Sequence, residues 1–108
     1  MTEVTVRVGK TEVTVTAITE AEERAIPEVA RKMGTLVGYD HYYYSDVAFE
    51  IAEGTPEDVI GETELTRIGA KIGIARDTDE WDVMNVLFWA LVEKAQEEWE
   101  NLADEDEE

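Results

Sequence analysis

Two short segments near the amino terminus, in which apolar and polar residues alternate, constrain the fold of this chain more than any other feature. A period of two puts their apolar residues on one face of paired β-strands. Gly9-Lys10 supplies glycine at the first central position of a two-residue turn, where a type II′ turn requires positive φ. We therefore expect a hairpin that pairs Val6 with Val13 and Val4 with Val15, with its apolar face covered by helices in an α+β fold. The alternating apolar residues are Val4, Val6, Val8, Val13, Val15 and Ala17.

A helix is expected directly after the hairpin. Thr19 and Glu22 have the spacing of a capping box, in which both side chains accept hydrogen bonds from exposed backbone N–H groups. The helix should run to about Met33, with Gly34 as its stop. Pro27 lies well inside this span, so we expect either a kink there or a helix that begins closer to the proline.

The middle of the chain is ambiguous between helix and strand. Residues 39–54 have apolar side chains at both spacings, and we favour a helix that ends at Gly54. Thr55-Pro56, followed by two acidic residues, predicts the start of a short helix. For residues 64–76 helix and strand remain open alternatives, because two glycines weaken the helical pattern and an alternating pattern competes with it.

The longest expected element is a helix that opens at Asp77-Thr78-Asp79-Glu80, where cap residues and acids suit the positive end. Apolar residues then recur at steps of three and four as far as Leu102. Every residue from Val86 to Val92 is apolar. We expect that stretch to be covered on all sides, at the centre of the domain or across a homodimer interface. Residues 1–102 should form one domain, followed by an acidic tail, residues 103–108, that is too like-charged to be stably helical.

Net charge is the extreme property of the sequence. The chain has 27 acidic and 9 basic residues, a formal charge of -18 at pH 7. Residues 77–108 hold two thirds of it, because they contain 13 acids and a single base, Lys94. Such a field repels nucleic acid and anionic membranes and attracts basic surfaces. We therefore expect a basic protein partner and no direct binding of nucleic acid or membrane.

Signals for chemistry are weak. The absence of cysteine excludes disulfides and thiolate zinc sites. His41, Ser45 and Asp46 lack the glycine-built elbow that presents a nucleophile, so a catalytic triad is disfavoured. The three aspartates within residues 77–82 lack the glycine and bidentate glutamate of a calcium loop, and helix capping explains them better. We expect a protein that is not an enzyme and that needs no metal or cofactor.

Targeting signals are also lacking. The first residues have no basic start or apolar run of a signal peptide, and the longest apolar run is too short to cross a bilayer. The expected location is the cytoplasm, that of the host cell if the protein is phage-encoded.

Aromatic residues cluster within residues 39–44, which contain four tyrosines and one histidine. They cannot all face a core from one element, so one or two phenol rings should be exposed, and tyrosine is enriched at interface hot spots. The alternative is that the rings line the junction between the hairpin and the helices. The tyrosines are Tyr39, Tyr42, Tyr43 and Tyr44.

The same region carries a family resemblance. His41-Tyr42-Tyr43, Asp46-Val47 and Ala52-Glu53-Gly54 resemble a segment of the Ocr family of phage anti-restriction proteins, and the acidic end after a tryptophan-containing helix is similar too. The resemblance implies a small acidic dimer whose carboxylates imitate the phosphates of bent DNA and occupy the DNA-binding cleft of restriction enzymes. That family is all-helical, whereas this chain begins with a hairpin, so the resemblance implies a functional class and not a fold.

Charge and resemblance together predict an acidic DNA mimic that inhibits a host defence protein of the restriction or CRISPR type. The alternative is a small α+β binding or regulatory domain from a high-salt cytoplasm, because 4 lysines against 27 acids also suit halophilic adaptation. The candidate partner-binding residues are Asp77, Asp79, Glu80, Asp82, Glu93, Glu97, Glu98, Glu100, Tyr42, Tyr43, Asp46 and Glu50.

Overall fold

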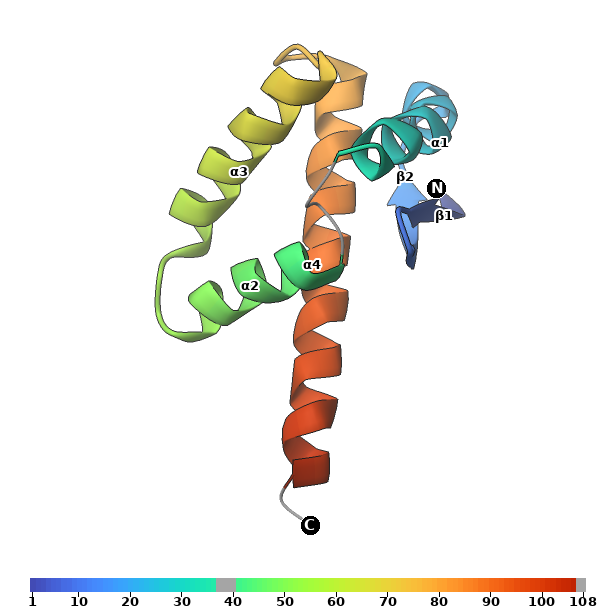
Figure 1. The fold of residues 1–108 in the computed structure, drawn as a ribbon. Helices are drawn as coiled ribbons and strands as arrows, with labels where there is room; N and C mark the ends of the chain where they lie inside the picture. Colours follow the sequence, from blue (N-terminus) through green and yellow to red (C-terminus); the bar gives the residue numbers. More distant parts are fainter. Residues whose placement is uncertain (37–40, 107–108) are drawn as a thin grey trace.

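A computed structural model describes residues 1–36 and 41–106, with side chains for residues 1–36 and 43–101 (Figure 1). A two-stranded hairpin and four helices confirm the α+β fold class. The hairpin and the three shorter helices surround one end of the last helix, whose other end extends beyond them (Figure 1). The elements are β1 (Thr2–Val8), β2 (Thr11–Ala17), α1 (Glu20–Gly34), α2 (His41–Ala52), α3 (Glu57–Ile72) and α4 (Asp79–Asp106).

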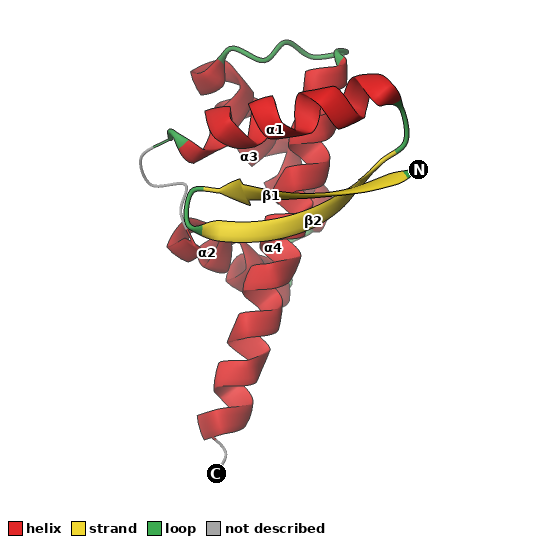
Figure 2. Cartoon of the chain, turned by 90° about the vertical axis from the view of Figure 1, so that its right-hand side faces the viewer, coloured by secondary structure: helices red, strands yellow, loops and turns green. Residues whose placement is uncertain are grey.

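The hairpin has the predicted register. Val6 pairs with Val13 and Val4 with Val15 in an antiparallel ladder, and Gly9 has the positive φ, 62°, that the turn requires. Val8, Val13, Val15 and Ala17 are buried. Their face packs against α1 and α4, so the hairpin lies across one side of the long helix (Figure 2).

Helix α1 begins at the predicted capping box. The Thr19 hydroxyl accepts a hydrogen bond of 3.1 Å from the backbone N–H of Glu22, and the Glu22 carboxylate accepts one of 3.2 Å from the N–H of Thr19. The helix starts at Glu20 and continues through Pro27 to Gly34, so the alternative of a later start is wrong. Pro27 is exposed, so the Glu23 carbonyl that loses its helical N–H partner also lies on the solvent-facing side of the helix.

Helices α2 and α3 resolve the ambiguous middle of the chain. The part of residues 39–54 that the structure describes is helical to Ala52, as favoured. The helix expected after Thr55-Pro56 is not short: α3 has 16 residues and continues through both Gly61 and Gly69. The strand alternative for residues 64–76 is therefore wrong. The left-handed Gly73, with φ 73°, ends α3 by donating its N–H to the Gly69 carbonyl at 2.9 Å.

The two glycines inside α3 admit two tryptophans of α4. A Cβ atom added to Gly61 would lie 2.5 Å from Cζ2 of Trp89, and one added to Gly69 would lie 2.6 Å from Cζ3 of Trp81. The two glycines are eight residues apart on α3, and the two tryptophans are eight residues apart on α4. Both spacings correspond to about 12 Å along the helix axis, so both contacts can form at once between the two helices. The glycines cost helix propensity but allow α3 and α4 to approach closely.

Helix α4 opens at Thr78, whose hydroxyl accepts a hydrogen bond of 3.2 Å from the N–H of Trp81. The helix continues to Asp106, so the prediction that the acidic tail is not helical is wrong for residues 103–106. Ala103 and Glu105 are good helix formers that favour continuing the helix, whereas each like-charge pair costs only about 0.2–0.5 kcal/mol.

The apolar stretch from Val86 to Val92 is mostly buried within the chain. Leu87, Phe88, Leu91 and Val92 are at most 1% exposed. Val86 is 43% exposed, so the chain's own elements do not cover the stretch at that residue. Most of the cover for this stretch therefore comes from the chain's own elements, and a homodimer contact at Val86 stays a prediction.

Gly61→Ala tests the contact between α3 and α4. Alanine in place of glycine usually stabilises a helix by about 1 kcal/mol. Here we expect a loss of about 1–3 kcal/mol in the free energy of unfolding, because the new methyl group overlaps the Trp89 ring. Urea unfolding followed by circular dichroism measures the change.

The matched control is Gly61→Ala in a Trp89→Leu background, where the ring is gone. There the alanine should stabilise the helix in the ordinary way, by about 1 kcal/mol. An alanine that stabilises both backgrounds equally would show that the ring does not require the glycine.

Candidate partner-binding surface

Five carboxylates share one exposed face of α4. Successive residues of a helix are about 100° apart, and these five lie within an arc of about 60°. All of them are exposed. The second and third carboxylates are eleven residues apart. The exposed Val86 lies in this interval, on the same arc. We call this set the α4 acidic row: Asp79, Asp82, Glu93, Glu97 and Glu100.

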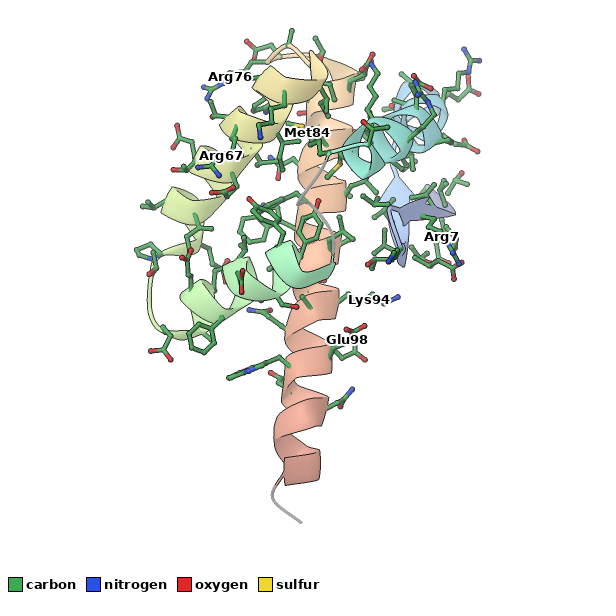
Figure 3. The ribbon with its side chains drawn as sticks, in the orientation of Figure 1. Arg7, Arg67, Arg76, Met84, Lys94 and Glu98 are labelled. Carbon is green, nitrogen blue, oxygen red and sulfur yellow. The ribbon has the colours of Figure 1, made fainter. Side chains whose placement is uncertain are left out.

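The α4 acidic row is not neutralised by the rest of the described chain. None of its five carboxylates forms an ion pair with a described residue. Lys94, the only cation in the sequence of α4, instead donates a hydrogen bond of 2.5 Å to the backbone carbonyl of Glu12. It projects from the side of α4 that is turned away from α3 (Figure 3). The row therefore faces solvent as uncompensated negative charge.

The other candidate carboxylates near α4 lie elsewhere. Glu80 is about 100° around the helix from Asp79 and its Oε2 is 3.1 Å from Nζ of Lys32, which ties α4 to α1. Glu98 projects on the same side as Lys94 (Figure 3). Asp77 precedes the helix in a left-handed conformation with φ 62°. Acids that are adjacent in sequence thus point in different directions, and only part of the predicted set forms one surface.

The described tyrosines are mainly structural. Tyr44 is 2% exposed, and its ring meets the edges of Tyr43 and Phe88 at centroid distances of 5.2 and 6.0 Å. The half-buried Tyr43 donates its hydroxyl proton to the Glu64 carboxylate of α3. These two rings therefore line the junction of α2, α3 and α4, and not the junction between the hairpin and the helices that was the second expected alternative.

The remaining candidates are on α2. Asp46 and Glu50 are exposed and four residues apart, so they share one side of the helix. Tyr39 and the side chains of His41 and Tyr42 lie outside the described residues, so the structure does not bear on an interface at Tyr42 or a triad with His41.

Elsewhere the surface charge is mixed. On α1 the Arg31 guanidinium donates a hydrogen bond of 2.5 Å to Glu28, which lowers the pKa of the Glu28 carboxyl. Arg24 lies 3.8 Å from Glu20 on the same helix. On α3, Arg67 lies 3.9 Å from Glu64. The cations thus lie beside acids on α1 and α3 and are missing from the exposed arc of α4.

Two surface features were not expected from the sequence. Phe49 of α2 and Trp99 of α4 are about half exposed and contact each other edge to face, with centroids 6.1 Å apart. A groove of about 460 Å³ lies between α3 and α4, with the indole rings of Trp81 and Trp89 among its walls. The eight-residue spacing of both the glycines and the tryptophans was the available signal, but it has meaning only once α3 and α4 are known to pair.

Metal and membrane sites find no support in the described residues. No group of three or more histidine, aspartate or glutamate side chains there is arranged to hold a metal ion. Within the same residues no helix has the length and apolar character that a bilayer span needs.

Comparisons with protein-family models, with curated proteins and with solved structures found no match.

Glu93→Gln tests whether the α4 acidic row is a cost to the fold. Glu93 has Glu97 one turn away, and the two line a shallow depression with Glu12 and one cation, Lys94. Removing its charge should raise the free energy of unfolding by about 0.2–0.5 kcal/mol at low salt, and this gain should vanish in 1 M NaCl. Chemical denaturation at both salt concentrations measures it.

Glu28→Gln is the matched control, because it is the same change at an exposed helical position that has a cation partner. It should destabilise the protein slightly, since Arg31 loses its acceptor. A loss of stability in Glu93→Gln as well would mean that the row supports the fold.

Proposed function

We propose that this chain is an acidic DNA mimic that binds the basic, nucleic-acid-binding cleft of a host defence protein, of the restriction or CRISPR type. The observation that carries the proposal is the α4 acidic row: five exposed carboxylates on one face of a helix, with no ion pair to any described residue. The action is binding alone and needs no catalytic group or cofactor.

The dimensions of the row suit a cleft built for a duplex. From Asp79 to Glu100 the helix rises about 32 Å, close to one turn of B-form DNA at about 34–36 Å. Glu93, Glu97 and Glu100 follow at axial steps of about 6 and 4.5 Å, compared with about 3.4 Å per phosphate along one DNA strand. The row is sparser than a duplex strand but has the same sign and comparable length.

The energetics also favour a binding role. Like charges on one helical face repel each other in the free protein, and the lysines and arginines of a basic cleft would relieve that repulsion on binding. Such complementarity contributes strongly to the rate of association, which falls as salt rises. The unpaired negative charge of the α4 acidic row does not stabilise the fold, and binding to a basic partner explains it better.

The first experiment identifies the partner and the surface together. The tagged protein is recovered from cells that carry defined restriction and CRISPR systems, and mass spectrometry identifies what is bound. We expect a nucleic-acid-binding defence protein that duplex DNA displaces and 0.5 M NaCl weakens. Recovery of no such protein, or binding indifferent to DNA and salt, would contradict the proposal.

Two triple variants then compare equal charge changes. Neutralising Glu93, Glu97 and Glu100 to Gln should weaken partner affinity at least about tenfold, equivalent to about 1.4 kcal/mol. The control neutralises three exposed glutamates outside the row, Glu3, Glu23 and Glu53, and should change affinity much less. Equal effects would mean that total charge matters and the row does not.

A thermal melt separates mimicry from halophilic adaptation. The pairing of cations with acids on α1 and α3 supports a directed acidic face over a uniform acidic coat. We therefore expect a cooperative unfolding transition well above room temperature at 0.1 M KCl, with a modest shift at 2 M. A chain that is unfolded at 0.1 M KCl and folds only in molar salt would favour halophilic adaptation.

A further inference from the structure

The groove between α3 and α4 is lined by residues that are not part of the α4 acidic row. Gly61 and Leu65 contribute to its apolar lining, and Trp81 and Trp89 present partly exposed indole rings. Its volume of about 460 Å³ is within the range of sites that hold a small organic group. We call it the α3–α4 groove.

The α3–α4 groove is also strongly acidic. Glu57, Asp58 and Glu62 line it from the first turns of α3, and Asp77 lines it from the loop before α4. None of these four carboxylates forms an ion pair with a described residue. Arg76 is the only cation among the lining residues. The groove therefore combines aromatic rings with excess negative charge, which favours a cationic occupant.

Arg76 already makes the kind of contact that such an occupant would make. Its guanidinium carbon lies 5.4 Å from the centre of the Trp81 ring, and its Nη2 donates a hydrogen bond of 2.7 Å to the Thr66 hydroxyl. Arg76 lies at the end of α3 next to the start of α4 (Figure 3). Trp89 contacts Phe88 edge to face, with centroids 5.2 Å apart, and remains partly exposed. No described cation lies over it, so one indole of the groove has an arginine of the chain over it and the other has none.

We propose that the α3–α4 groove binds an arginine side chain of the basic partner, with its guanidinium over Trp89 and its N–H groups donated to Asp58 and Glu62. Those two carboxylates are four residues apart on α3 and so share one side of the helix. Arginine suits the site better than lysine, because its planar guanidinium stacks on an indole and spans two carboxylates. The inference rests on the proposed function for the nature of the partner, and it adds a specific anchor beside a diffuse charged row.

The test uses hexa-arginine and hexa-lysine peptides as probes, with the full chain at 0.15 M NaCl. Calorimetry should give a hexa-arginine affinity about fivefold above that of hexa-lysine. In ¹⁵N-edited spectra, hexa-arginine should shift the indole N–H signal of Trp89 more than that of Trp99, which lies outside the groove. Equal affinities for the two peptides, or an unmoved Trp89 signal, would overturn the proposal.

Two double variants with the same charge change locate the effect. Asp58→Asn with Glu62→Gln alters exposed residues of the groove and should remove the preference for arginine. Glu93→Gln with Glu97→Gln alters the α4 acidic row and should weaken both peptides equally, leaving the preference intact. A preference that survives the groove variant would contradict the assignment.

The natural partner separates this inference from the proposed function. If the partner binds through the row but tolerates the groove variant, the groove proposal fails and the function stands. If hexa-arginine binds the groove but no defence protein is recovered from cells, the function fails and the groove stands.

Discussion

Burial of one side of α4 is the interaction on which the rest of the structure depends. A two-stranded hairpin is marginal in isolation, and here its apolar face is covered by α1 and α4. Helices α1, α2 and α3 also pack on α4, around Met84, Leu87, Phe88 and Leu91. A helix surrounded on three sides has one remaining arc, and that arc carries the α4 acidic row. The core and the candidate interface are thus opposite sides of the same helix, and the packing that holds the fold together also fixes the direction of its charge.

Local patterns predicted the elements whose signals lie within one segment. Alternating valines and Gly9 determined the hairpin register, and the Thr19 capping box determined where α1 begins. The prediction for α3 was ambiguous between helix and strand because glycine lowers helix propensity. Packing of two tryptophans from α4 against these glycines offsets that cost, and this packing cannot be predicted from the α3 segment alone. At the end of α4, helix propensity prevailed over like-charge repulsion, a balance of small terms that inspection of charge alone misjudges.

The sequence predicted that the candidate site is an acidic surface, but only partly which acidic residues share one face. The concentration of acids pointed to α4, and the step of about 100° between helical residues separates Glu80 from Asp79 without any tertiary information. The ion pair between Glu80 and Lys32 required the packing of α1, which no local pattern contains. The α3–α4 groove also depends on tertiary packing, so local patterns could not predict it. In the sequence its two tryptophans have the spacing of ordinary core residues, and the groove forms only because a glycine-bearing helix packs opposite them.

The end of α4 that extends past α2 has a kinetic consequence (Figure 1). Packing stops near Trp99, since Ala95 is 1% exposed whereas Trp99 is 47% exposed. A partner could therefore approach α4 at Trp99 and Glu100 without displacing the chain's own elements. In the proposed complex, a long-range encounter would be steered first by the carboxylates of this turn, and the packed part of the helix would then set the final orientation.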